Sequence, residues 1–531
     1  MFLRITRNRR GKNVYEYARI AERYIENGRQ KTRTLEYLGP VKNQDDRERY
    51  IKALQIYRER EAIKAGIPGE FSLLPAMDFG IFHASMHIMR EEGILSALKR
   101  NAGVYLHIVV FMIVSRLIDP SSDLSLLETQ RMVYYPWSDL RLNNDNIYRA
   151  LDRMISRKES LELDLFHALN PDTSVVHYDL TSSYFEGRED NDLVLFGYSR
   201  DKKRGKKQIV IGLVMAGGIP IYHEVWPGNT IDPKTLESTL SVLRERFRIT
   251  NVIFIGDRAF GRDASLKHLD QNRYITAAYR WDQPYRQVMT GTGFDEADLA
   301  DNLFMKEVHV DMDDLVDEGT TGEERGLIVK RRHIVVYNSD REKLDLRDME
   351  EKVNAVRKKI GEISDMGDLK KSLGKLKSFV KFTKTGVIVN EKRINTLKGL
   401  AGRFMIITNT DLPVREVVNA YKDQWRIERS FRTIKSFLEI RPVYHRKSGR
   451  IKAHVFVCVL SLLISRMIEK RSSLTISEAS RQLSYLKVTP VRLGSGMVMM
   501  SSESDRASSL LKKMGIPYPE KTIKSAQTSL T

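Results

Sequence analysis

The fold is most narrowly constrained by one stretch of sequence, Tyr421-Lys-Asp-Gln-Trp-Arg-Ile-Glu428-Arg-Ser-Phe-Arg-Thr-Ile-Lys435. Candidate N-cap residues precede it at 409–411 and a proline follows it at 442, so the pattern predicts one helix over residues 413–438. Tyr421, Glu428 and Lys435 are seven residues apart, about two helical turns, and would share one face. A neighbouring apolar stripe would pack the helix, and it consists of Ile427, Phe431, Ile434 and Leu438.

Upstream of this helix, two apolar segments each lead into an aspartate. Residues 174–179 read Ser-Val-Val-His-Tyr-Asp and end on Asp179. Residues 251–256 read Asn-Val-Ile-Phe-Ile-Gly and are followed by Asp257. The continuous apolar run in the second segment is typical of a strand that is buried on both faces. Both segments are therefore predicted to be strands with a carboxylate at the end.

The region between the two aspartates predicts a hairpin followed by a helix. Residues 208–216 and 219–226 have the composition of strands and are joined by Gly217-Gly218, a strong signal for a two-residue turn. Residues 232–246 are predicted to be helical, with Asp232 as the N-cap. The order strand, hairpin, helix, strand predicts an α/β domain.

Three carboxylates in this arrangement suit the chemistry of phosphodiester bonds. Cleavage requires activation of the attacking oxygen and stabilisation of the leaving oxygen, which two cations about 4 Å apart can provide. Mg²⁺ prefers oxygen ligands, and Asp179, Asp257 and Glu428 could supply them. Each residue alone has an ordinary alternative, such as a turn residue, a helix cap or a solvated helix face. The hypothesis rests on their joint occurrence in this order.

The composition indicates several domains and a polyanionic partner. The chain has 531 residues and a formal net charge of +19, which favours nucleic acid or an anionic membrane as the partner. Its one cysteine, Cys458, excludes a disulfide framework and a cysteine-based zinc site. The sequence contains neither a P-loop nor an HExxH motif, so it gives no support for ATP use or zinc peptidase chemistry.

Two apolar runs, residues 105–114 and 455–464, fall short of the about 20 residues that a membrane span needs. We predict that both are buried core helices. The basic N-terminus lacks the apolar stretch of a signal peptide. A cytoplasmic protein without membrane association is therefore expected.

The N-terminal third of the chain predicts a small β module followed by helices. Residues 14–19 and 31–38 have strand-like alternation around a basic turn at 7–12, and could form a DNA-binding arm or a meander packed on the body. Residues 45–64, 85–97, 105–117 and 146–155 are predicted to be helical. The segment 146–151 could open a recognition helix, but this signal is weak, and an ordinary helical bundle explains it better.

The predicted organisation has six parts. They are a basic β module (1–42), a helical, DNA-binding region (43–170), the first part of the catalytic core (171–300), an insertion (301–405), the last part of the core with the Glu428 helix (406–470), and a C-terminal tail region (471–531).

Beyond these patterns, the sequence resembles the DDE transposases of prokaryotic insertion sequences, in the IS-four-type superfamily. It is similar to the branch marked by Tyr, two residues, Arg, three residues, Glu, six residues and Lys, which Tyr421, Glu428 and Lys435 match. Gln424 stands where that branch has Arg. Further segments add to the match: Trp425, 427–428, 430–432, 438–445 and 450–454, and upstream 178–183, 196–202, 226–230 and 255–261.

The resemblance implies a ribonuclease H-like catalytic core with a β-rich insertion between the second Asp and the Glu. It implies an enzyme that hydrolyses DNA at the ends of the element and uses the 3′-hydroxyl to attack target DNA. Asp179, Asp257 and Glu428 would be the catalytic metal ligands, for Mg²⁺ with Mn²⁺ as a substitute. The DNA-contacting residues would be Tyr421, Gln424, Lys435, Arg258 and Arg432. The partner would be double-stranded DNA, bound by a homodimer in the cytoplasm at the nucleoid.

Two other functions remain open: a nuclease that cuts without joining, and an inactive or domesticated copy that only binds DNA. Weaker features are a basic loop at 200–207 and His177, two residues before Asp179. His223, His445 and His454 have no recognisable metal-ligand spacing. Because a neutral amide cannot replace a guanidinium fork, we expect Gln424→Ala to weaken activity much less than Lys435→Ala.

The net charge of +19 predicts salt-sensitive DNA binding. The logarithm of the affinity should fall by about 0.9 per phosphate contact for each tenfold rise in salt concentration. Titration of the protein with labelled DNA across a salt series measures this slope. A flat response would remove the electrostatic part of the hypothesis.

Overall fold

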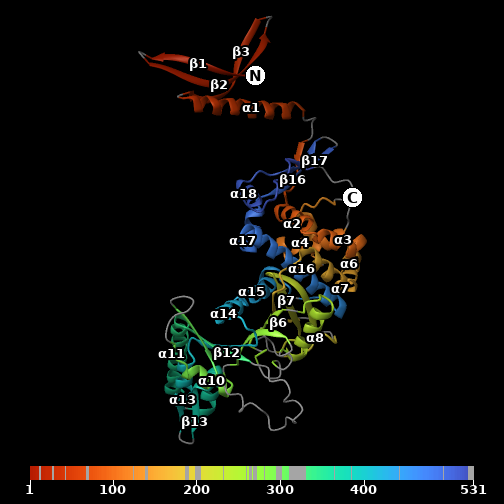
Figure 1. The fold of residues 1–531 in the computed structure, drawn as a ribbon. Coiled ribbons are helices and arrows are strands. Elements are labelled where there is room, and N and C mark those ends of the chain that lie inside the picture. Colours follow the sequence, from red (N-terminus) through yellow and green to blue (C-terminus); the bar gives the residue numbers. More distant parts are fainter. Residues whose placement is uncertain are drawn as a thin grey trace. The chain divides into compact units, whose positions relative to one another are not determined.

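A computed structural model describes most of the chain, which divides into two compact units (Figure 1). Unit 1 comprises Met1–Met77, Lys487–Ser502 and Pro519–Ala526, and unit 2 comprises Asp78–Leu486, Glu503–Tyr518 and Gln527–Thr531. The described residues are 1–10, 13–26, 29–41, 43–66, 71–123, 125–137, 142–185, 191–197, 205–230, 232–250, 252–258, 260–261, 266, 269, 272–279, 281–294, 302–309, 331–363, 365–383, 386–441, 443–493 and 496–523.

Unit 1 begins with an antiparallel meander of β1 (Phe2–Arg10), β2 (Asn13–Glu26) and β3 (Arg29–Val41), followed by helix α1 (Gln44–Gly66). Both predicted strands lie inside β2 and β3. The predicted basic turn at 7–12 lies mostly in β1, whose last residue Arg10 pairs with Asn13. Residues 11 and 12 are outside the described residues.

A second sheet in unit 1 contains β18 (Thr522–Ile523), β17 (Gly496–Ser501), β16 (Lys487–Leu493) and β4 (Phe71–Leu73) in that order. The C-terminal region that we expected as a tail is therefore folded as far as Ile523. It also contributes α17 (Ile476–Leu483) and α18 (Asp505–Lys513) to unit 2. Ala507, Leu510 and Leu511 have the i, i+3, i+4 spacing of one helix face, and all three side chains of α18 are buried.

Unit 2 opens with a helical layer. Its helices are α2 (Gly80–Glu91), α3 (Ile94–Ala102), α4 (Leu106–Ile118), α5 (Leu126–Met132), α6 (Asn144–Ser156), α7 (Lys158–Leu169) and the later α16 (Ser448–Ser472). The helix predicted over 85–97 is wrong as one element, because Gly93 lies between α2 and α3 with a φ of 71°. That left-handed conformation suits glycine and ends a helix.

Two helical stretches, Ile94–Ile118 and Ser448–Ser472, are long and apolar enough to cross a membrane by length and composition alone. The expectation that the apolar runs are too short is thus corrected, because each lies within a stretch of 25 residues. In their most apolar windows, 72% and 94% of residues are buried inside the protein. That burial fits the predicted core helices.

The centre of unit 2 is a mixed sheet of eight strands in the order β11-β12-β15-β10-β9-β6-β7-β8, so the α/β prediction is confirmed. The strands are β6 (Val175–Tyr184), β7 (Gln208–Ala216), β8 (Ile219–Pro227), β9 (Ile253–Ile255), β10 (Arg273–Ala277), β11 (Leu303–Val308), β12 (Arg332–Asn338) and β15 (Arg403–Thr408). Neighbours β6, β9 and β10 are parallel, and the other pairs are antiparallel. The predicted hairpin is β7 and β8, whose turn residues Gly217 and Gly218 have φ of 56° and 81°.

The two faces of this sheet pack against different helices. In β9, Phe254 points into the larger core cluster, which includes residues of α8 (Asp232–Glu245) such as Leu236. Ile253 and Ile255 point into the opposite cluster, with Val417 and Val418 of α14 (Val414–Lys422). Alternation along each strand therefore decides which side chains face α14.

The described part of the expected insertion is more helical than the resemblance implies. Besides β11 and β12, it contains α11 (Ser339–Glu362), α12 (Met366–Leu373), a 3₁₀ turn (Gly374–Phe379), the hairpin β13 (Val380–Thr383) and β14 (Gly386–Val389), and α13 (Glu391–Gly399). These elements enclose their own core around Val353 and Val356. The side chain of Asn338 caps α11, and acidic residues occupy its first turn, both of which favour helix formation. Residues 310–330 lie outside the described residues.

One buried and one half-buried histidine of unit 2, His333 and His83, predict a loss of stability in acid. Burial lowers the pKa of His333 and of His83 from 6.5 to about 4. The unfolded chain therefore takes up protons between these pKa values, so the stabilisation is present above pH 6.5 and lost as the pH falls toward 4.

We expect urea unfolding to show a falling free energy over that interval. In His333→Gln, the fall in the free energy of unfolding between pH 6.5 and pH 4 should be smaller by about 1–3 kcal/mol. Replacement of the exposed His167 by Gln is the matched control and should leave the curve unchanged. Identical curves for the wild type and His333→Gln would contradict the assignment.

Candidate active site

Asp179 and Asp257 lie side by side at one edge of the parallel ladder. Strand β6 pairs with β9 from Val175 opposite Ile253 to His177 opposite Ile255. Each aspartate lies two residues beyond the last of these pairs. Both are therefore on the face of the sheet that α14 covers. Contrary to the prediction, β6 does not end at Asp179, because its antiparallel pairing with β7 continues to Tyr184. Asp179 is thus held inside a strand rather than at its end.

The helix predicted over 413–438 is wrong as one continuous element. It divides into α14 (Val414–Lys422), α15 (Trp425–Arg432) and a π-helical turn (Thr433–Phe437). Between α14 and α15, the backbone N–H of Gln424 donates to Tyr421 three residues back, at 3.1 Å, which is a tighter turn than an α-helix makes. Seven-residue spacing therefore does not by itself align Tyr421, Glu428 and Lys435.

The environment of Tyr421 nevertheless brings the predicted residues together. Burial raises the pKa of the Tyr421 phenol above its ordinary value. Four charged side chains also act on this pKa: the guanidinium of Arg258 lowers it, and the carboxylates of Asp257, Glu428 and Asp179 raise it. All three predicted carboxylates are thus within electrostatic reach of one hydroxyl group. The ring itself is held against Phe404, with centroids 5.9 Å apart.

Gln424 has partners in the protein that the sequence did not indicate. The side chain is only 5% exposed. Its carboxamide, oriented so that both polar atoms are satisfied, donates to the carbonyl of Gly256 at 3.1 Å and accepts from the N–H of Asp257 at 2.8 Å. The carbonyl of Asp257 also accepts a hydrogen bond from the Thr276 hydroxyl at 2.8 Å. The backbone at Asp257 is therefore fixed on both sides.

The other predicted site residues lie close to Glu428 or Asp257 along the chain. Glu428 and Arg432 are exposed on α15, Lys435 is half-buried in the π-helical turn, and Arg258 is exposed directly after Asp257. Whether these cations contact DNA stays a prediction. Most of the basic loop at 200–207 lies outside the described residues.

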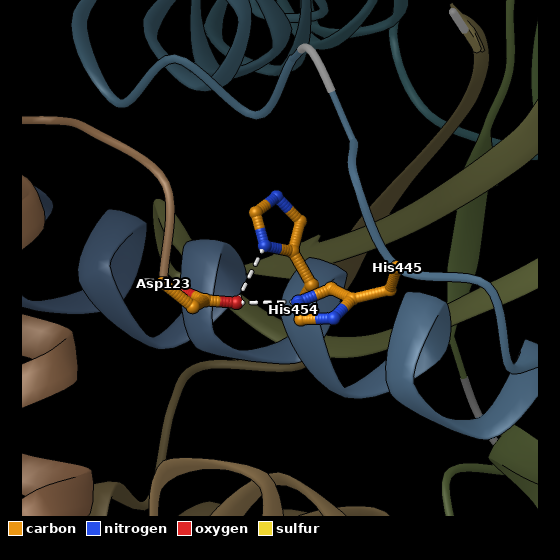
Figure 2. Close-up of side chains that lie close together, drawn as sticks. All are labelled: Asp123, His445 and His454. Carbon is orange, nitrogen blue, oxygen red and sulfur yellow. Dashed lines mark hydrogen bonds and ion pairs between the residues drawn. The ribbon is translucent and has the colours of Figure 1, made fainter. Parts of the chain in front are cut away.

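A second group of possible metal ligands lies elsewhere in unit 2, and Figure 2 shows Asp123, His445 and His454 converging. Their candidate ligand atoms all lie within 4.8 Å of one another. Asp123 Oδ2 is 2.6 Å from His445 Nε2 and 3.1 Å from His454 Nδ1. Sequence patterns missed this group because Asp123 is remote along the chain and the two histidines are nine residues apart.

The buried guanidinium of Arg116 lies among the side chains of this second group. It donates to Asp123 Oδ1 at 3.0 Å and lies 3.2 Å from His454 Nδ1. Burial would raise the pKa of Asp123, but His454, His445 and Arg116 together hold it well below its usual range. Since the ion pair is already balanced, a metal ion would add uncompensated positive charge to a buried site. We therefore interpret the group as a structural network.

This network forms hydrogen bonds to the backbone directly after the π-helical turn. Arg116 donates to the carbonyls of Leu438 and Glu439 at 3.3 and 3.4 Å, and His454 Nε2 is 3.0 Å from the carbonyl of Ile440. Glu439 has a φ of 43°, which is strained for a residue with a side chain and needs such support. The network thus fixes where the segment bearing Lys435 ends.

Comparison with known proteins gives family matches over the N-terminal sheet with α1 and over the domain that contains the candidate site. Residues 171–464 match the family described as transposase DDE domain, and residues 3–65 match the N-terminal domain of the IS1634 family transposases. The transposase of insertion sequence element IS231E from Bacillus thuringiensis subsp. finitimus is 30% identical over 109 residues, which is 20% of this chain and 22% of that protein. The match therefore spans about a fifth of each chain.

Solved structures give weaker similarity. The piggyBac transposase synaptic complex with hairpin DNA has a TM-score of 0.35 and 9% identity, over 78% of this chain and 82% of that one. The Mos1 transposase paired-end complex has a TM-score of 0.14 and 15% identity, over 29% and 52% of the two chains.

Arg116→Met tests the structural interpretation of the Asp123 network. Removal of the guanidinium leaves a buried carboxylate without its cation, which should lower the free energy of unfolding by about 3–5 kcal/mol. Urea denaturation measures this loss, and added Zn²⁺ should not raise the stability of the wild type. A stable Arg116→Met protein, or strong stabilisation of the wild type by Zn²⁺, would instead favour a metal centre.

Proposed function

The chain belongs to the prokaryotic insertion-sequence transposases with a DDE domain, and we propose that it cleaves DNA at the ends of an insertion sequence and joins the freed 3′-hydroxyl group to target DNA. The observation that carries the proposal is the electrostatic convergence of Asp179, Asp257 and Glu428 on Tyr421. The parallel pairing of β6 with β9, which places the two aspartates side by side, supports it independently.

We assign the strands β8-β7-β6-β9-β10 and helix α8 to a ribonuclease H-like core. A hairpin on one side of β6 and parallel strands on the other support this assignment, with α8 between β8 and β9 in the chain. Both aspartates lie at the carboxyl edge of parallel strands, where α/β sheets commonly bind ligands. The residues 301–405 then form the insertion, and the helices of residues 43–170 are proposed to contribute to DNA binding.

The proposed ligands fit a hard divalent cation. Asp179, Asp257 and Glu428 offer only carboxylate oxygens, which Mg²⁺ prefers, and Mn²⁺ is expected to substitute. When bound, the metal would activate the attacking oxygen and stabilise the charge of the leaving oxygen. Three neighbouring carboxylates repel one another, and this repulsion favours binding of a cation.

The residues around the carboxylates would hold the DNA backbone. The phenol of Tyr421, whose pKa burial and the nearby carboxylates raise above its ordinary value, is protonated at neutral pH and can donate a hydrogen bond to a phosphate oxygen. Lys435, Arg258 and Arg432 would supply positive charge to the same backbone. Gln424 has a different role in this proposal, since its amide holds the backbone of Asp257.

The proposed partners are the two DNA ends of the element and a target duplex, bound by a homodimer. The cytoplasm, where the nucleoid lies, is the proposed site of action. The high positive charge of the chain supports a DNA partner.

Asp257→Asn tests the catalytic assignment, since it keeps the shape of the side chain and removes its charge. Cleavage and strand transfer with Mg²⁺ should both collapse, and the triple variant of Asp179, Asp257 and Glu428 should be scarcely worse than the single one, because the three residues act as a unit. Gel assays with a donor carrying the element ends and a target plasmid measure both steps.

The control is binding to the same DNA ends, which should persist because Lys and Arg residues on other surfaces supply most of the affinity. Cutting at near wild-type rate by folded Asp257→Asn would contradict the assignment. Cleavage without joining by the wild type would indicate a nuclease instead.

Gln424 provides a second test, and the structure reverses the expectation from the sequence. Gln424→Ala removes both hydrogen bonds to the backbone around Asp257, so we expect a loss of activity at saturating Mg²⁺ of about 10- to 100-fold, comparable with that of Lys435→Ala. The Mg²⁺ concentration needed for half-maximal cleavage should rise for Gln424→Ala and stay unchanged for Lys435→Ala. Unchanged activity and Mg²⁺ dependence in Gln424→Ala would refute this role.

A further inference from the structure

The three-stranded sheet of unit 1 separates its charges between two faces. Strands β1 and β2 pair without a bulge from Phe2 opposite Ala21 to Arg10 opposite Asn13. Side chains alternate between faces along each strand, so the even positions of β1 share a face with the odd positions of β2. The assignment of every side chain in the ladder to one face follows from this register.

Helix α1 lies along this sheet (Figure 1) and covers the face that carries the odd positions of β1 and the even positions of β2. Tyr50 of α1 lies against Gly39, where an added Cβ would come within 2.7 Å of the phenol oxygen. Arg47 of α1 binds Glu16 at 2.8 Å. The carboxylates of β2 all lie on this face, and each is paired with a cation of the sheet: Glu16 with Arg7, Glu22 with Arg33, and Glu26 with Lys31.

The second face, which we call the open face, carries arginines and aromatic rings. The arginines with described side chains are Arg4, Arg19 and Arg23, and the register places no Asp or Glu of β1, β2 or β3 beside them. Arg23 lies over the ring of Phe2 at 5.2 Å, and Arg19 lies over that of Tyr37 at 5.7 Å. The open face is thus positively charged, and the rings orient its guanidinium groups.

One guanidinium nitrogen on the open face lacks the hydrogen-bond acceptor that a buried donor normally has. Arg19 Nε is buried and makes no hydrogen bond within the described part of the chain. Guanidinium groups without a carboxylate beside them suit an anionic acceptor from outside the chain. Phosphate oxygens suit guanidinium groups, which bind them through two parallel hydrogen bonds.

We propose that the open face binds the backbone of a DNA duplex. A narrow antiparallel sheet has the dimensions to enter or straddle the major groove, and its arginines would meet the phosphates on either side. Tyr15 and Tyr37, which are 45% and 55% exposed, would contact sugars or bases at the same surface. The choice of DNA as the polyanion rests on the proposed function, whereas the choice of surface rests on the register and the charges.

Two charge-matched variants test the proposal. The open-face variant is Arg4→Gln with Arg19→Gln and Arg23→Gln, and the control variant is Arg7→Gln with Lys31→Gln and Arg33→Gln on the helix-covered face. Binding of a short fluorescein-labelled DNA duplex of random sequence to the full chain is measured by anisotropy across a salt series. The open-face variant should bind about tenfold more weakly or worse, and its salt slope should fall by up to about 2.7, or 0.9 for each lost phosphate contact. The control should stay close to the wild type.

Equal weakening of both variants would overturn the proposal, because net charge alone would then explain binding. Wild-type affinity in the open-face variant, no binding by the wild type, or a loss seen only with an RNA duplex of the same sequence would also overturn it. Coincident circular dichroism melts ensure that both variants are folded. Asp257→Asn should bind this duplex like the wild type, so failure of the proposed chemistry and failure of this surface give different results.

Discussion

Parallel pairing of β6 with β9 is the constraint on which the candidate active site depends. Three residue pairs, ending at His177 and Ile255, set the relative position of the two strands. Because side chains alternate, the same pairing turns Asp179 and Asp257 toward the helices that follow β15. The apolar contacts of Val417 and Val418 hold α14 on this face, and Glu428 follows on α15.

At the candidate site, repulsion among the carboxylates and hydrogen bonds to the backbone have opposite effects on the stability of the fold. Three carboxylates act on the pKa of one phenol at this site, and we expect their mutual repulsion to lower the stability of the folded protein in the absence of a cation. Gln424 and Thr276 counteract this by fixing the backbone of Asp257 from two sides, and the Arg116 network fixes the chain beyond the π-helical turn. Sites that work against stability are expected to be held by such surrounding contacts.

Local signals in the sequence predicted the elements around the site well. The Gly217-Gly218 turn and the alternation around it predicted β7 with the bounds found in the structure, and Asp232 predicted the start of α8. The strand β10, which completes the parallel ladder, was missed, because its five residues are too few to show a clear pattern of alternation.

Tertiary contacts decided what the sequence could not predict. The break between α14 and α15 occurs where Gln424 turns inward to the backbone of β9, and helical periodicity carries no information about that contact. Similarly, Asp123, His445 and His454 are brought together only by the packing of distant helices. The two aspartates could be singled out because each follows an apolar segment, whereas the end of β6 and the groups that hold the backbone of Asp257 could not be predicted.

The central claim is that one metal site is formed by Asp179, Asp257 and Glu428 together. Fe²⁺ bound in place of Mg²⁺ generates hydroxyl radicals with ascorbate and peroxide, and these cut the polypeptide close to the bound ion. Mapping of the cut positions by mass spectrometry tests the claim directly. We predict cuts near residues 179, 257 and 428 that excess Mg²⁺ suppresses together. Cuts near residues 123, 445 and 454, or at only one of the three predicted segments, would contradict it.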